Sequence, residues 1–208
     1  FEPDTIKRHR LLQDYQVEVG VPIVAALCQR LNSAQDVIDK MGEVYAEPKY
    51  DGMRVQIHFS SFAPYSPLQP LIKAFTRNLE DVSHMFAPEL DQLTKIFAAQ
   101  STSFVLDSEA VGFNPQTGAF LSFQETITRK RKHNISAHAE STPVRFHVFD
   151  LLVFNNKSLL ELPLVERKKV LDSAFKDNNF LLHTPDRIIS DPEELRSFHN
   201  QELAAGLE

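Results

Sequence analysis

The chain has 208 residues, of which 42% are hydrophobic, so it can bury a sizeable core in one large domain. Its net charge of −6 argues against a general nucleic-acid binder, although a local basic groove is still compatible with it. A single cysteine, Cys28, excludes an internal disulfide and suits a reducing compartment, and no apolar run approaches transmembrane length. We expect an intracellular protein without a membrane span, with Cys28 as a small core residue.

The amino-terminal part predicts a polar lead-in, a helix and a strand pair. Residues 1–20 are polar without a clear period and predict a linker or the tail of an upstream domain. Ser33 predicts the N-cap of a helix and Gly42 its end. Two strands are predicted over 44–49 and 53–59. Hydrophobic and polar residues alternate in the second strand, so we expect an antiparallel pair that is buried on one face.

Strand and helix patterns are mixed through the rest of the chain, after a proline-bearing loop over 60–70. The further predicted strands are 71–77, 103–113 and 144–154, and the predicted helices are 80–88, 89–99, 122–132, 163–175 and one that begins at Pro192. We expect Pro88 to separate two helices and Asp191 to cap the last one. This mixture indicates an α+β fold with mainly antiparallel sheets.

The strongest chemical signal is the run Glu47-Pro48-Lys49-Tyr50-Asp51-Gly52-Met53-Arg54. It places a lysine at the end of a strand, before a tight Asp-Gly turn. A lysine amine is a nucleophile when it is neutral, and nearby positive charge with partial burial would lower its pKa. Arg54 can hold a phosphate by two hydrogen bonds. The pattern K-x-D-G-x-R resembles that of the covalent nucleotidyltransferases, which are DNA ligases, RNA ligases and mRNA capping enzymes.

Four further stretches resemble, in order, motifs of ATP-dependent DNA ligases. They are Phe75-Thr76-Arg77-Asn78, Leu106-Asp107-Ser108-Glu109-Ala110-Val111, Phe146-His147-Val148-Phe149-Asp150-Leu151-Leu152 and Ala205-Gly206-Leu207-Glu208. Connecting segments resemble the archaeal type of these enzymes, for example Phe123-Gln124-Glu125 followed by the basic run 129–132. The resemblance covers nearly the whole chain, from about Val21 to Glu208, and is therefore far more specific than the lysine motif alone.

The resemblance implies an adenylation domain with the nucleotidyltransferase (ATP-grasp-like) fold. In that family, two antiparallel sheets are flanked by helices, with the nucleotide in the groove between them. We expect residues 21–208 to form this domain, truncated at its carboxyl end and lacking the OB-fold domain, with residues 1–20 leading in from a DNA-binding domain. Alone, the 208 residues are expected neither to seal nicks nor to adenylate themselves well.

The resemblance also assigns roles to individual residues. Lys49 would be the catalytic nucleophile. The nucleotide-binding residues would be Glu47, Lys49, Arg54, Arg77, Glu109 and Phe149. The metal would be held by Glu109 and Glu208, and DNA would be contacted by Arg129, Lys130, Arg131 and Lys132.

Reasoning from the residues alone leaves other roles open for several of these positions. Glu47 could form a cross-strand salt bridge, Phe149 could be core packing, and Glu109 could be one half of a buried ion pair. The basic run 129–132 could be a solvated helix end. Asp107 is expected to be structural.

The implied ligands are ATP and Mg²⁺, with Mn²⁺ as an alternative metal. The implied partners are nicked double-stranded DNA and a sliding clamp, and we expect a monomer, cytoplasmic in a prokaryote or nuclear in a eukaryote. The alternative functions are an RNA ligase or an mRNA-capping type of nucleotidyltransferase. From another class, the alternative is a non-catalytic nucleotide-binding or scaffold module.

Overall fold

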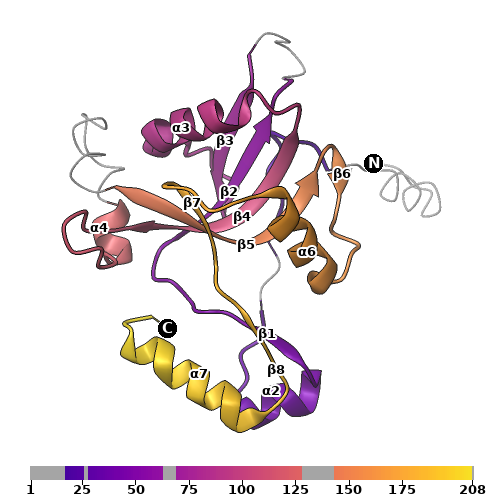
Figure 1. Ribbon diagram of the computed structural model, residues 1–208, viewed down its shortest axis with the longest axis vertical. Helices are drawn as coiled ribbons and strands as arrows, with labels where there is room; N and C mark the ends of the chain where they lie inside the picture. The colour runs from indigo at the N-terminus through magenta and orange to yellow at the C-terminus, as the bar shows by residue number, and fades with distance from the viewer. Residues whose placement is uncertain (1–16, 26–27, 63–68, 128–142, 208) are drawn as a thin grey trace, which may run out of the picture.

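The computed structural model describes residues 17–25, 28–62, 69–127 and 143–207. The chain forms a large unit around one sheet and a smaller lobe that lies below it in Figure 1. None of the helices in these ranges combines the length and the apolar character that crossing a membrane requires. Mixed helices and mainly antiparallel sheets confirm the expected α+β class.

The large unit is built on a six-stranded sheet in the order β3-β2-β4-β5-β6, with β7 beside β5. Its strands are β2 (Met53–Ser60), β3 (Leu71–Thr76), β4 (Ser103–Gly112), β5 (Val144–Phe154), β6 (Lys157–Ser158) and β7 (Leu181–His183). Its helices are the 3₁₀ helix η1 (Ser83–Phe86), α3 (Ala87–Phe97), α4 (Phe123–Ile127) and α6 (Leu164–Ala174). All strand pairs are antiparallel except β5 with β7, which is parallel.

The core of this unit lies on one face of the sheet. Val55, Ile57 and Phe59 alternate along β2 and are fully buried, as the sequence pattern requires of a strand with an apolar face. Helices α3 and α6 close this face through residues such as Leu93 and Leu171. Because the central strands are fixed by this core, residues at their ends have defined neighbours.

The other face of β2 is covered as well, which corrects the expectation of a half-buried strand. Gln56 exchanges two hydrogen bonds with the backbone of Ile23, at 2.9 and 2.7 Å. The amide of Gly20 donates to Nδ1 of His58 at 3.0 Å. The segment 17–25 therefore lies across the polar residues of β2. Periodicity could not show this, because the covering segment is distant in sequence.

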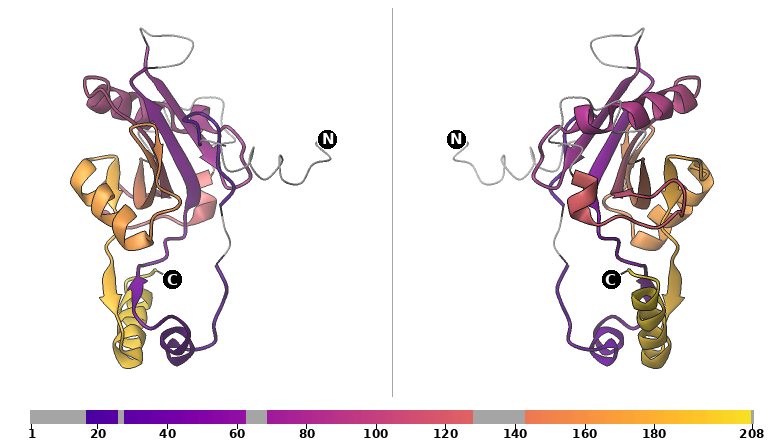
Figure 2. Two further views of the ribbon diagram at one scale, coloured as in Figure 1. Left: turned by 90° about the vertical axis from the view of Figure 1, so that its right-hand side faces the viewer. Right: turned by 90° about the vertical axis from the view of Figure 1, so that its left-hand side faces the viewer.

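The smaller lobe contains α2 (Ala34–Met41), β1 (Val44–Ala46), β8 (Arg187–Ile189) and α7 (Pro192–Ala204). It has its own core of Val44, Ile189 and Phe198, against which side chains of α2 and α7 pack. The predicted caps are confirmed: Ser33 Oγ accepts from the amide of Asp36, and Asp191 Oδ1 from that of Glu194. Figure 2 shows the lobe from two sides.

Three local predictions were wrong. The strand before the lysine, β1, pairs with β8 and not with β2, and it is shorter than the predicted 44–49. The predicted helix 80–88 is instead a bridge between Asp81 and Phe75 followed by η1, so Pro88 lies in the first turn of α3. Cys28 is exposed and not a core residue. The first two errors arose because tertiary pairing overrode a local pattern.

Candidate active site

Lys49 lies in the segment that joins β1 to β2, between two buried neighbours. Pro48 and Tyr50 are buried, whereas Lys49 is exposed. The Tyr50 ring packs on His147 at a centroid distance of 4.1 Å and edge-on against Phe120 at 5.5 Å. Burial raises the pKa of Tyr50 to about 12, so its phenol stays neutral. The backbone is thus anchored on both sides of the exposed Lys49.

Gly52 brings this segment into close contact with β4. A Cβ atom at this position would lie 2.6 Å from the carbonyl oxygen of Ala110 and 2.8 Å from Cγ of Glu109. Only glycine avoids such a contact, so this position of the K-x-D-G pattern has a steric reason. Asp51 Oδ2 accepts a hydrogen bond from the amide of Phe123, at the start of α4, at 3.2 Å. The lysine segment is therefore fixed to the sheet at the level of Glu109.

The sheet register brings the predicted site residues together at one end of neighbouring strands. Arg54 of β2 lies opposite Glu109 of β4. Val55 pairs with Thr76, the last residue of β3, so Arg77 follows β3 at the same end of the sheet as Arg54. The charges of Arg54 and Lys49 both act on Glu109. The structure thus gathers two arginines, a carboxylate and the lysine that lie up to 60 residues apart in the sequence, between Lys49 and Glu109.

Asp107 holds Arg54 in a fixed orientation. Nε and Nη2 of Arg54 donate to the two carboxylate oxygens of Asp107 at 3.1 and 2.7 Å. The Asp107 side chain is 4% exposed, whereas that of Arg54 is 32% exposed. This hydrogen-bonded pair keeps the pKa of Arg54 above its usual value. Asp107 is thus structural, as expected, and the arginine remains accessible to a ligand.

Glu109 is a carboxylate in an unfavourable environment. Burial, opposed by Arg54 and Lys49 and reinforced by Asp107 and Asp51, raises its pKa to about 7. A cation beside it would favour the ionised form. Within the described ranges, no three His, Cys, Asp or Glu side chains gather into a group that could hold a metal by themselves. Mg²⁺ is commonly held by one or two carboxylates together with substrate phosphates, and a single Glu109 fits that mode.

Phe149 occupies an irregular position in β5. Ser108 pairs with Val148 and Asp107 with Asp150, so Phe149 is an extra residue at a β-bulge. It is only half-buried, and its ring centroid lies 5.3 Å from the guanidinium carbon of Arg54. An aromatic ring that is displaced from the core and lies beside Arg54 can stack on a planar ligand.

Glu47 forms an ion pair, which was the alternative role considered for it, but its partner lies in a helix and not in a neighbouring strand. Lys168 of α6 donates to Oε1 of Glu47 and also lies 3.1 Å from Oδ2 of Asp186. Burial raises the pKa of Glu47, and Lys168 opposes the shift. Lys168 could not be singled out from the sequence, because it lies in a run of charged residues that is typical of an exposed helix face.

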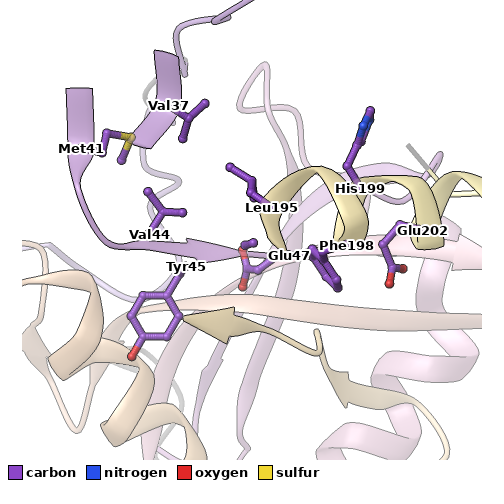
Figure 3. Close-up of a pocket in the computed structure, with 10 residues that line it drawn as sticks. Val37, Met41, Val44, Tyr45, Glu47, Leu195, Phe198, His199 and Glu202 are labelled. Carbon is purple, nitrogen blue, oxygen red and sulfur yellow. The ribbon is translucent and has the colours of Figure 1, made fainter. Parts of the chain in front are cut away.

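One cavity, of about 320 Å³, lies in the smaller lobe (Figure 3). Val37 and Met41 of α2 lie on one side of it, and Leu195 and Phe198 of α7 on the other. Glu47 also lines it, but Lys49, Arg54 and Glu109 do not. The cavity is therefore not the centre formed around the lysine. The remaining predicted residues, Glu208 and Arg129 to Lys132, lie outside the described residues.

Residues 25–208 match the family model described as "ATP dependent DNA ligase domain". The chain belongs to the ATP-dependent DNA ligase family. The match covers most of the 208 residues and confirms the resemblance carried by the ordered motifs.

Curated relatives agree with this assignment to the ligase family. The "Probable DNA ligase" of Dictyoglomus turgidum is 34% identical over 197 residues, which are 95% of this chain and 32% of the relative. The "DNA ligase" of Caldivirga maquilingensis is 35% identical over 194 residues, 93% of this chain and 31% of the relative. The ligase-family chain thus spans about a third of the length of these curated relatives.

A solved ligase structure has the same fold. A "mycobacterial DNA ligase D complexed with ATP and MES" is similar with a TM-score of 0.57 and 23% sequence identity. The similarity covers 80% of this chain and 46% of that chain. At this identity the likeness speaks for the fold, and it confirms the expected nucleotidyltransferase architecture.

Proposed function

We propose that this chain is the adenylation domain of an ATP-dependent DNA ligase, which seals nicks in double-stranded DNA through a covalent lysyl-AMP intermediate. The observation that carries the proposal is the position of Lys49. It is exposed between two buried residues, and its segment is fixed to β4 beside Arg54 and Glu109. A fixed nucleophile beside cationic charge is what phosphoryl transfer requires of a protein.

In the first step, Nζ of Lys49 attacks the α-phosphorus of ATP. A P–N bond forms, the P–O bond to the β-phosphate breaks, and pyrophosphate leaves with the electron pair. Arg54 and Arg77, at the same end of the sheet, bind the phosphates and offset the charge that develops on their oxygens. The half-buried Phe149 stacks on the base, and Glu47 contacts its edge.

A divalent cation, Mg²⁺ or Mn²⁺, fits the carboxylate of Glu109, with Glu208 as a second ligand from outside the described residues. When bound, it neutralises phosphate charge. In the later steps AMP passes to the 5′-phosphate at a nick, and the neighbouring 3′-hydroxyl displaces it to close the strand. The basic residues 129–132 contact the DNA, and a sliding clamp is a further partner of an intracellular, monomeric enzyme. The family match favours a DNA acceptor over RNA ligation or capping.

The test is the intact mass of the full-length gene product that carries this chain, after incubation with ATP and Mg²⁺. A gain equal to AMP is expected in the wild type and in Lys40→Ala, a control at an exposed lysine of α2. Lys49→Ala should show no gain. A nicked duplex with a labelled 5′-phosphate should then be sealed by the wild type and by Lys40→Ala, and not by Lys49→Ala. An AMP adduct that persists in Lys49→Ala, or no adduct in the folded wild type, would contradict the proposal.

A further inference from the structure

Lys168 is a buried cation held between two carboxylates. Its side chain is 5% exposed, and it forms ion pairs with Glu47 and, at 3.1 Å, with Asp186. Burying an ammonium group costs several kcal/mol unless partners of opposite charge compensate it. The side chain of its neighbour on α6, Lys169, is 66% exposed instead, and it pairs with Glu166 on the same helix, one turn away.

The two carboxylates come from two segments that cross between the large sheet and the smaller lobe. Glu47 lies between β1 and β2, and Asp186 lies between β7 and β8. In Figure 1 both crossings run between the sheet and the lobe, to the left of α6. Helix α6 is itself tied to β5, because Arg167 donates two hydrogen bonds to Asp150 at 2.8 and 2.9 Å. Lys168 therefore fixes the Glu47 carboxylate relative to the sheet, two residues before Lys49.

We infer that Lys168 is a positioning residue that makes the site selective for a 6-aminopurine nucleotide by holding Glu47 as an ionised hydrogen-bond acceptor. The inference rests on the proposed function, in which Glu47 contacts the edge of the base.

The chemistry follows from the two states of a carboxyl group. An ionised carboxylate only accepts hydrogen bonds, so it binds the 6-amino group of adenine and repels the 6-oxo group of hypoxanthine or guanine. Lys168 bonds Oε1 of Glu47, and Oε2 has its own lone pairs for the base. A protonated Glu47 would instead donate a hydrogen bond, and a 6-oxo group would accept it.

Burial and the neighbouring carboxylates favour the protonated form of Glu47, and Lys168 opposes them. Burial is the largest influence that raises its pKa, and the negative charges of Asp186 and Asp150 act in the same direction. Lys168 lowers it through both its hydrogen bond and its charge. Removing this one cation therefore takes away a hydrogen bond and a positive charge that both lower the pKa of Glu47, and it leaves Lys49, Arg54 and Glu109 in place.

The test compares ATP with inosine triphosphate, which carries a 6-oxo group and a proton on N1. The full-length gene product is used, and kcat/KM for attachment of each nucleotide to Lys49 is measured by intact mass. Lys168→Met keeps the apolar stem and removes the charge, and the ratio of kcat/KM for ATP over inosine triphosphate should fall roughly 10- to 100-fold, as expected for one hydrogen bond to a charged group. Lys168→Arg should retain the wild-type ratio. Lys169→Met, the matched control on the same helix, should leave it unchanged.

Equal losses for both nucleotides in Lys168→Met, with the ratio preserved, would overturn the inference and leave Lys168 a purely structural residue. If thermal unfolding shows that Lys168→Met is not folded, Glu47→Gln decides, because its amide can both accept and donate. Its ratio should also fall, and an unchanged ratio would overturn the inference. If the folded wild type transfers neither nucleotide, the proposed function and this inference are both refuted. That outcome is distinguishable from a preserved ratio in Lys168→Met, which would refute this inference alone.

Discussion

Replacing Gly52 with alanine tests whether the contact between the lysine segment and β4 positions Lys49. The added Cβ would lie 2.6 Å from the Ala110 carbonyl oxygen, a backbone atom that cannot rotate away, and 2.8 Å from Cγ of Glu109. Ordinary contacts between heavy atoms lie near 3.5 Å, so the segment must move by roughly 1 Å. Overpacking of this kind costs about 1–3 kcal/mol of unfolding free energy.

A loss of about 2 kcal/mol corresponds to a fall in Tm of roughly 4–8 °C for a chain of this size. Activity should fall further than stability, because a shift of about 1 Å in a reacting group can lower a rate roughly 100-fold. The assays are calorimetric unfolding and single-turnover formation of the lysyl-AMP adduct at a temperature where the variant is fully folded.

Gly118→Ala is the comparison variant. Gly118 has a φ of 73°, and nothing lies within 4 Å of its added Cβ. The substitution should cost about 1 kcal/mol through left-handed backbone strain and leave adduct formation unchanged. Adduct formation at the wild-type rate by Gly52→Ala would refute the steric reasoning, as would equal losses of activity in both variants.

Three further predictions concern single side chains. Asp107→Asn removes the negative charge and one of the two hydrogen bonds that Arg54 donates. The free energy of unfolding in urea should fall by about 2–3 kcal/mol, which is less than for a fully buried pair because the Arg54 side chain is 32% exposed. Phe149→Leu should raise the Kd for ATP roughly tenfold, the loss of one aromatic stacking contact, measured by titration calorimetry. Burial, with a smaller effect of the nearby Lys73, lowers the pKa of His58 to about 4 from an unfolded value of 6.5, so the unfolded state binds more protons between these values. The contribution of neutral, buried His58 to the free energy of unfolding is fully present above pH 6.5 and decreases by about 3 kcal/mol as the pH falls to 4. The variant His58→Asn should lack this pH-dependent contribution.

The predictions for Phe149 and His58 each have a control on a comparable residue. Phe154→Leu, in the same strand but packed against the core, should lower stability without weakening ATP binding. His199→Asn, at an exposed histidine of α7, should keep the pH dependence of the wild type. The reasoning for Asp107 would be contradicted if Asp107→Asn were as stable in urea as the wild type. The reasoning for Phe149 would be contradicted if the two phenylalanine variants bound ATP equally well, and that for His58 if His58→Asn kept the wild-type pH profile of stability.

The sequence by itself determined several of the local elements and the chemistry of the lysine motif. The N-cap at Ser33, the alternation of Val55, Ile57 and Phe59, and the cap at Asp191 depend on residues within one or two turns, so they could be read directly. The motifs and their order identified the family in the same way. Each motif consists of residue types at short, fixed spacings, so it can be recognised without the tertiary structure.

The tertiary structure alone decided which distant residues meet. The partner of β1 is β8, more than 140 residues away in the register from Val44 to Ile189, and no local pattern encodes it. The bulge that displaces Phe149 depends on how β4 and β5 pair. From the sequence, Lys168 would be taken for a surface lysine. In the fold, the two segments that cross between the large sheet and the smaller lobe place Glu47 and Asp186 against it. Burial and charge compensation are properties of the assembled fold, so the contacts that fix the candidate site could be found only there.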